Sequence, residues 1–195
     1  MVLPLFPLST VLFPEGPLSL RIFETRYVDM VRGCMREGSP FGVVMIRSGA
    51  EVGPVSEVAE LGTTARIVDF SALPDGLLGI TCTGERKFRV LKRRQRPDGL
   101  NLGEVEYCPP EPVLEPPDEY RNLSDLLRKL LPQLGAPYAE IPGKFMDASW
   151  VGCRLAEILP LELADKLDLL GLDDPIARLA RLSRVVRFAP ESPES

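Results

Sequence analysis

The spacing of hydrophobic positions changes part-way along the chain. Up to about residue 110, apolar residues alternate with polar ones or form short runs bounded by proline, glycine and aspartate, which is typical of strands. These segments are 2–8, 18–22, 41–47, 59–70, 77–83, 88–94 and 100–107. A helix interrupts them, because between Thr25 and Glu37 the apolar residues keep to one helical face. Thr25 is its expected N-cap, and Gly38 is its expected end.

Two Pro-Asp-Gly sequences mark the predicted hairpin turns. They stand at residues 74–76 and 97–99, and an Asp-Gly pair tolerates the positive φ angles of a two-residue turn. With such a turn in the second of them, Arg93 would face Glu104 across the two strands. Short strands joined by hairpins predict a curled sheet or pseudo-barrel.

Beyond residue 108 the pattern becomes helical. Five prolines within residues 108–117 exclude a helix or a central strand there and predict a stiff connection. Leucine stripes at helical spacing follow, with Asp118 as the expected first N-cap and Asp174-Pro175 opening the last helix. We therefore predict an α+β fold with a β part and one helix over 1–110, a connection over 111–117, a helical part over 118–188 and a loose tail over 189–195.

The 195 residues include no histidine. This absence excludes Ser-His-Asp and Cys-His nucleophile pairs and histidine-ligated zinc. No P-loop or GxGxxG nucleotide motif is present, and the four cysteines, which form no CxxC pair, are expected to be reduced core thiols. Ser-Lys and carboxylate chemistry stays open, although no lysine stands in a nucleophile motif. We predict no catalytic residue, no metal site and no cofactor.

Charge and hydropathy restrict the partners and the compartment. The net charge of −5 argues against a nucleic-acid backbone as the main ligand. No apolar run is long enough to span a membrane, and prolines interrupt the apolar N-terminus, which lacks the basic start of a signal peptide. We expect a cytoplasmic protein with no membrane partner.

Two basic segments could bind a ligand, but each also has a structural interpretation. Residues 86–96 hold seven arginines and lysines, which would suit RNA, but Glu104 and Glu106 on the next strand favour a solvated hairpin with paired charges. The last helix carries a second basic stripe, formed by Arg178, Arg181, Arg184 and Arg187. Its spacing of three predicts an exposed face, with binding to an acidic partner as the alternative.

The N-terminal segment carries a long motif. It reads Leu-Pro-Leu-Phe-Pro-Leu at 3–8, Val-Leu-Phe-Pro-Glu-Gly-Pro-Leu-Ser-Leu at 11–20 and Ile-Phe-Glu-Thr-Arg-Tyr at 22–27. Further matching segments are 41–44, 60–67, 73–76, 83–90 and 149–170. Together these residues resemble the N-terminal, substrate-binding domain of Lon proteases over about residues 1–188.

This resemblance implies both a fold and a role. The fold would be a pseudo-barrel related to the PUA type, followed by a helical bundle. The role would be recognition of unfolded or tagged polypeptides without catalysis, because the ATPase and the Ser-Lys peptidase of a full Lon protease are not matched. Glu24 and Arg26 would form a structural ion pair or contacts at the start of the helix.

We predict a polypeptide-binding surface close to this motif. An apolar groove between the β part and the helices would capture the apolar side chains and free backbone groups of an unfolded chain. Its candidate lining residues are Leu12, Phe13, Pro14, Phe23 and Tyr27. The alternative is that these side chains belong to the core. A specific partner protein, RNA and a small molecule are the other ligands considered, and the sequence predicts no oligomeric state.

Overall fold

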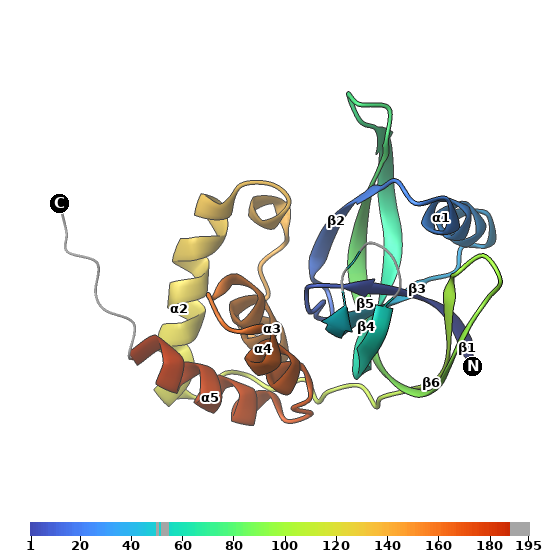
Figure 1. Cartoon of the computed structure of the whole chain (residues 1–195). Coiled ribbons are helices and arrows are strands. Elements are labelled where there is room, and N and C mark those ends of the chain that lie inside the picture. The colour runs from blue at the N-terminus through green and yellow to red at the C-terminus, as the bar shows by residue number, and fades with distance from the viewer. Residues whose placement is uncertain (50, 52–54, 188–195) are drawn as a thin grey trace. The chain divides into compact units, whose positions relative to one another are not determined.

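Six strands form one mixed sheet in the first half of the chain (Figure 1). The computed structural model describes residues 1–49, 51 and 55–187. The strands are β1 (Val2–Leu8), β2 (Pro17–Ile22), β3 (Phe41–Gly49), β4 (Val55–Ala72), β5 (Leu78–Gln95) and β6 (Asn101–Tyr107). Their order is β2-β5-β4-β3-β1-β6, and a further pairing of β5 with β6 closes five of them into a ring. The predicted α+β class is confirmed.

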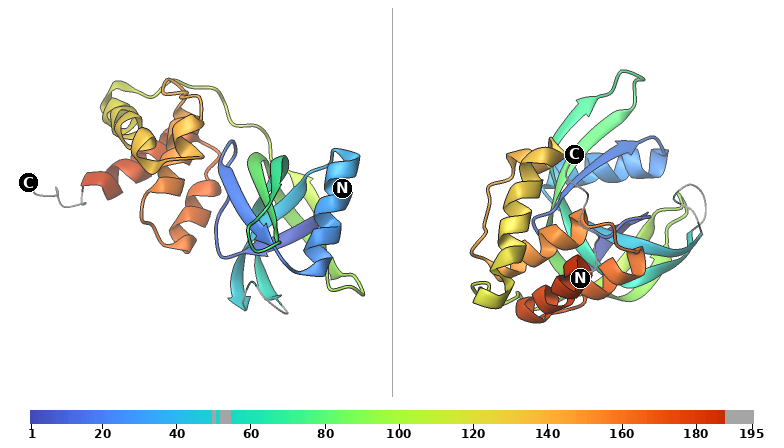
Figure 2. Two further views of the ribbon diagram at one scale, coloured as in Figure 1. Left: turned by 90° about the horizontal axis from the view of Figure 1, so that it is seen from above. Right: turned by 90° about the vertical axis from the view of Figure 1, so that its left-hand side faces the viewer.

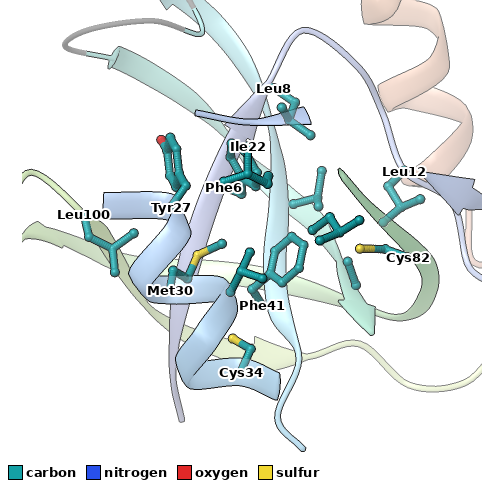
Figure 3. Close-up of a cluster of buried hydrophobic side chains, with 14 residues drawn as sticks. Phe6, Leu8, Leu12, Ile22, Tyr27, Met30, Cys34, Phe41, Cys82 and Leu100 are labelled. Atoms are coloured by element: carbon teal, nitrogen blue, oxygen red, sulfur yellow. The ribbon is translucent and has the colours of Figure 1, made fainter. Parts of the chain in front are cut away.

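Strand alternation supplies the ring with two hydrophobic clusters. Leu3 and Leu5 of β1 pack with Val44, Phe88 and Val105. The other face of β1 contributes to a larger cluster beneath α1 (Thr25–Glu37), which is drawn in Figure 3. β1 and β3 run parallel to each other and are buried on both faces, as the continuous apolar run at 41–47 predicts.

Helix α1 packs along one side of the sheet. Tyr27, Met30 and Cys34 lie in a row on its buried face (Figure 3). Gly38 ends the helix in the left-handed conformation, with φ 62°, as predicted. The N-cap prediction was wrong by one residue, because Thr25 is the first helical residue and Glu24 occupies the cap without a side-chain hydrogen bond.

Both predicted hairpins form, but their turns hold three residues rather than two. In the second hairpin the Gly99 N–H donates to the Arg96 carbonyl, and the Arg96 N–H donates to the Leu100 carbonyl. Gly99 has φ 84°, which is the geometry of a turn followed by a glycine bulge. The extra residue shifts the register, so that Arg93 faces Gly103 and the predicted pairing with Glu104 was wrong.

Contacts divide the chain into two compact units. The β unit comprises Met1–Pro110 and Glu162–Leu167, and the helical unit comprises Glu111–Leu161 and the chain from Asp168 onward. The segment at 162–167 therefore clusters with the β unit, which the sequence pattern does not indicate. The helices after α1 are η1 (Asp118–Tyr120), α2 (Arg121–Leu130), η2 (Leu131–Leu134), η3 (Tyr138–Glu140), α3 (Ala148–Ile158), α4 (Leu163–Leu170) and α5 (Pro175–Arg187).

Helices α2, α3, α4 and α5, whose ribbons are seen from two sides in Figure 2, all contribute buried leucines or other apolar residues to the core of the helical unit. Asp147 caps α3 by accepting hydrogen bonds from the Ser149 and Trp150 amides, and Asp174 accepts one from Ile176 at the start of α5. Asp118 does not act as the predicted N-cap: it is the first residue of the short η1 turn and pairs with Arg121 at 2.7 Å.

The basic stripe of α5 is not a uniformly exposed face. Arg178 is fully buried and forms two hydrogen bonds with the Glu111 carboxylate, at 2.8 and 2.6 Å. Its guanidinium also donates to the Leu169 and Leu172 carbonyl oxygens. Burial alone would lower the pKa of Arg178, but the hydrogen bonds that it donates to Glu111 and its attraction to Cys153, Glu111 and Asp173 together outweigh burial, and the pKa is raised. Arg181 pairs with Asp168 at 3.2 Å, and Arg184 is exposed.

Candidate binding pocket

A pocket of about 350 Å³ opens on the β unit at the start of α1. Consecutive residues 19–22 of β2, which is the end strand of the sheet, form one side of it. The β1 side chains Phe6 and Leu8 form another side. The described lining is completed by Phe23, Glu24, Tyr27 and Glu51.

Aromatic stacking fixes the floor of the pocket. The rings of Phe6 and Tyr27 stack with centroids 4.1 Å apart, and Phe41 lies 6.0 Å from Phe6. Tyr27 is only 3% exposed. These rings come from β1, β3 and α1 and pack against one another beneath the pocket.

The hydroxyl of Tyr27 is a buried polar atom with no hydrogen-bond partner among the described residues. Figure 3 shows it pointing away from Met30 and Phe41. Burial raises the pKa of Tyr27; Arg26 opposes this shift, and the Glu24 and Glu51 carboxylates add to it. A neutral hydroxyl without a partner costs about 1–3 kcal/mol, and a ligand that hydrogen-bonds to it would recover that free energy.

The rim of the pocket combines an exposed aromatic ring with fixed charges. Phe23 is 55% exposed, so its ring is accessible at the rim. Glu24 pairs with Arg26 at 2.7 Å, as the resemblance predicts, and the Arg26 guanidinium also lies over the Tyr27 ring. Arg21 pairs with Asp75 of the β4–β5 turn. Two ion pairs therefore involve residues of the pocket lining, Arg21 and Glu24.

The five predicted lining residues fall into two groups. Phe23 and Tyr27 line the pocket together. Leu12 and Phe13 are buried, at 4% and 0% exposure, and Pro14 is half-buried. None of these three is among the residues that line the pocket. The prediction of a groove between the β part and the helices stays a prediction.

The loop that carries Leu12 and Phe13 is held by backbone contacts. Thr63 donates a hydrogen bond to the Leu12 carbonyl oxygen at 2.6 Å. The Glu15 N–H donates to the Gly84 carbonyl at 2.7 Å, and the Gly84 N–H donates to the Gly16 carbonyl at 2.8 Å. A Cβ at Gly84 would overlap the Phe13 carbonyl oxygen, so the close approach requires glycine there. These contacts indicate a structural role for the loop.

Sequence reasoning missed much of the pocket. Phe6, Leu8 and Leu20 belong to alternating strands and look like ordinary core positions in the sequence. Glu51 lies far from the other lining residues along the chain. One sequence signal could have found the site. At residues 23–26, polar and charged residues follow Phe23 directly after an apolar strand, and Phe23 belongs to neither the predicted strand nor the predicted helix.

The described lining combines apolar side chains with charged and hydroxyl-bearing ones. It contains no histidine, cysteine or lysine, and its side chains are apolar except for Ser19, Arg21, Tyr27 and two glutamates. No group of three acidic, histidine or cysteine side chains suited to a metal occurs in the described part of the chain. Within that part, no helix has the length and hydropathy to span a membrane.

Comparisons with known proteins identify the family. The family model of the ATP-dependent protease La (LON) substrate-binding domain matches residues 2–187. A "Lon N-terminal domain protein" from Xanthomonas campestris has a solved structure with a TM-score of 0.79 and 40% identity, covering 97% of this chain and 99% of that one. The N-terminal domain of a Mycobacterium avium complex Lon protease shares the fold, with a TM-score of 0.67 and 17% identity over 97% and 100% of the two chains.

Two longer curated proteins are also similar. Lon protease 2 of Myxococcus xanthus is 26% identical over 91% of this chain and 22% of its own length. Protein cereblon of Xenopus tropicalis is 29% identical over 66% of this chain and 28% of its own length. The chain therefore spans about a quarter of these relatives, and the match to Lon covers its substrate-binding domain and no ATPase or peptidase segment. This chain belongs to the LON substrate-binding domain family.

Proposed function

We propose that this protein is a non-catalytic recognition module that binds unfolded or extended polypeptides through the pocket beside α1. The observation that carries the proposal is the combination of an apolar floor, an exposed Phe23 and an unpartnered, buried Tyr27 hydroxyl in one pocket. An apolar side chain of the ligand would displace water from the floor, and a polar group beside it would bond to the hydroxyl. The family's substrate-recognition role supports this assignment.

A binding assay with a chemically unfolded protein tests the proposal. The probe is a fluorescent, reduced and carboxymethylated test protein, and the same protein in its folded form is the negative probe. Anisotropy should show binding of the unfolded probe only. Phe23→Asp should weaken that binding by at least about tenfold, because it places a charge on the apolar rim.

The matched control variant is Leu91→Asp. Leu91 is 63% exposed in the same unit but does not line the pocket, so its variant should bind like the wild type. Both side chains are exposed, and both variants should therefore stay folded by circular dichroism. Equal binding by wild type and a folded Phe23→Asp variant would rule out this pocket as the polypeptide site.

A small-molecule ligand is the second candidate for the same pocket. Its volume of about 350 Å³ falls within the range of roughly 300–1,000 Å³ seen for small-molecule sites. A compound that occupies it should raise the melting temperature of the wild type and leave that of Phe23→Asp unchanged. If such a compound binds without competing with the unfolded probe, the polypeptide proposal loses its site.

We also infer a cytoplasmic location. All four cysteines are free thiols; Cys34, Cys82 and Cys153 are buried and Cys108 is half-buried, which suits a reducing compartment. Fractionation of cells that express the protein tests this inference, and recovery in an oxidising compartment would contradict it.

A further inference from the structure

Strand β4 has an edge that no strand covers among the described residues. β3 pairs with β4 only as far as Phe41, which stands opposite Ala65. Beyond that point β4 continues through residues 66–72 with β5 on one side alone. Figure 1 shows this hairpin extending past the closed part of the sheet. A free strand edge exposes a row of backbone donors and acceptors, which is the template that an added strand uses.

A side chain satisfies one backbone donor of this edge. The Phe70 N–H donates to the carboxylate of its own neighbour, Asp69, at 2.8 Å. A register shift between Ile67 and Asp69 marks an irregularity at Val68. Such devices blunt an edge against uncontrolled association, but they leave it open to a partner that can replace the Asp69 contact.

An apolar row crosses the sheet and ends uncovered at this edge. Leu20, Ile80 and Phe70 stand opposite one another on β2, β5 and β4. Leu20 is half-buried and Ile80 is 2% exposed, yet Phe70 is 58% exposed. The last residue of the row, Phe70 on β4, is therefore exposed. One more strand with an apolar residue next to Phe70 would continue the row.

A second pocket lies directly beside the edge. It has a volume of about 260 Å³, and it is bounded by residues 66–70 of β4 and by the end of α1. From α1 and its cap come Cys34, Met35, Gly38 and Ser39. Met35 is 38% exposed and Val68 is 57% exposed, so α1 and β4 each contribute an exposed apolar side chain to this pocket. An extended chain paired with β4 would have room here for a side chain.

We propose that residues 66–72 of β4 are a strand-addition site for an extended polypeptide segment with apolar residues at alternate positions. Backbone hydrogen bonds to β4 would supply affinity for any sequence, and the pocket beside Phe70 would select an apolar side chain. This inference rests on the proposed function, because it takes the polypeptide as ligand, but it concerns a different surface of the β unit from the pocket lined by Phe23 and Tyr27.

A second copy of this chain fits the edge less well than a client segment. Residue 69 is the centre of 66–72, so antiparallel pairing of two identical edges about that centre would place Asp69 opposite Asp69. Like charges directly opposite each other in a sheet are destabilising. The net charge of −5 on each chain adds a general repulsion between copies.

The test uses peptides whose backbone can be blocked on one edge. The probe is a fluorescein-labelled peptide of about ten residues in which valine alternates with threonine between terminal lysines. Two further peptides carry N-methyl groups on every second residue, one in each register. Strand addition predicts that one methylated peptide loses at least about tenfold in affinity while the other binds like the parent. Equal affinity of all three peptides, or equal loss by both methylated ones, would overturn the site.

Protein variants place the binding on the molecule. Phe70→Asp should weaken binding of the parent peptide by at least about tenfold. Leu91 is similarly exposed on the same unit, and Leu91→Asp should not change the affinity for this peptide. Chemical-shift changes in the wild type should be confined to 66–72 and the end of α1. A Phe70→Asp variant that is folded and binds the peptide normally contradicts the proposal.

The outcomes separate this proposal from the failure of the proposed function. If the unfolded test protein binds the wild type, and Phe23→Asp but not Phe70→Asp abolishes binding, the function stands and the strand edge is wrong. If neither the test protein nor the peptide binds the wild type, both fail. A concentration-dependent dimer in sedimentation that Phe70→Asp abolishes would assign the edge to a second copy and overturn the client assignment.

Discussion

Arg178 of the helical unit and Tyr27 of the β unit are both buried polar residues, but their surroundings differ. Arg178 lies between two carbonyl oxygens and a carboxylate that holds it with two hydrogen bonds. The Ser149 hydroxyl donates to the same carboxylate at 2.6 Å. Tyr27 has its ring stacked on Phe6 and its hydroxyl without a partner at a pocket.

This difference distinguishes a structural polar group from a candidate binding group. A buried charge with its hydrogen bonds made holds elements together, and here Glu111 of the proline-rich connection, α3 and α5 meet at Arg178. A buried hydroxyl without a bond stabilises nothing by itself, and its position in a residue that lines a pocket makes it the candidate binding group of the proposed function. Substitutions at Glu111, which holds Arg178, and at Tyr27 itself test this distinction.

The largest effect is expected for Glu111→Ala. This change leaves the Arg178 charge buried without its carboxylate, which should lower the free energy of unfolding by about 3–5 kcal/mol. Denaturant unfolding followed by circular dichroism measures it. Glu115→Ala, an exposed glutamate in the same connection, is the matched control and should stay within about 0.5 kcal/mol of the wild type. If Glu111→Ala and Glu115→Ala had equally small effects on stability, the contact between Glu111 and Arg178 would not be structural.

Buried thiols and a buried phenol should make the protein sensitive to alkali. Burial raises the pKa of Cys82 from 9.0 to about 12 and that of Cys153 from 9.0 to about 11. Burial likewise raises the pKa of Tyr138 to about 12. Above pH 9 the unfolded chain therefore releases protons that the folded chain keeps, so stability should fall as pH rises, by up to about 1.4 kcal/mol per pH unit for each of the two buried thiols and by less for the half-buried Tyr138.

Cys82→Ala isolates one of these groups. The variant removes the Cys82 thiol, so its unfolding free energy should fall less steeply than that of the wild type between pH 9 and about pH 12. The absolute loss of packing from the smaller side chain is the same at every pH and does not alter the slope. An unchanged slope would mean that this thiol ionises as easily in the folded protein as in the unfolded one.

Tyr27→Phe should separate stability from binding. Removing an unpartnered hydroxyl should leave stability unchanged or raise it by up to about 1 kcal/mol, since its desolvation is no longer required. Binding of the unfolded probe should weaken several-fold, because the hydrogen bond to the ligand is lost. Thermal melts and anisotropy on the same samples measure both quantities. A clear loss of stability would show that the hydroxyl has a structural partner after all.

The smallest effect is expected for Ser124→Ala in the helical unit. Its hydroxyl is also buried without a partner among the described residues, but it lines none of the pockets described above. Stability should change by less than about 1 kcal/mol, and binding of the probe should not change. We infer that an unpartnered hydroxyl indicates a binding site only when it also lies at a pocket. Weaker binding in the Ser124→Ala variant would contradict this inference.

The sequence predicted those features that depend on local periodicity. Alternation and the Pro-Asp-Gly turns located most strands, and Gly38 ended α1 as expected, but the segments 77–83 and 88–94, predicted as two strands, form the single strand β5. The register of the last hairpin was missed because the number of residues in the turn depends on Gly99 taking a left-handed conformation after Asp98. An Asp-Gly pair suits turns of either length, so the sequence alone does not decide between them.

The candidate site depended on contacts between distant residues. Phe13 stands beside Pro14 in an apolar segment and Phe23 stands between apolar and charged residues, and the sequence predicted both as lining of one groove. In the structure Gly84 meets the backbone at Phe13, which is fully buried, while Phe23 stays 55% exposed. The open edge of β4 is equally non-local, because it exists only where β3 parts from β4 at Ala65.

Site-specific photo-crosslinking tests the pocket beside α1 most directly. Phe23 is replaced by a photoreactive benzoylphenylalanine, and Leu91 is replaced in the same way in a control protein. On illumination with the unfolded probe, we predict a crosslinked product from position 23 and none above background from position 91, with excess unlabelled unfolded protein suppressing the product. Equal crosslinking from the two positions, or none from position 23 while the probe is bound, would contradict the account.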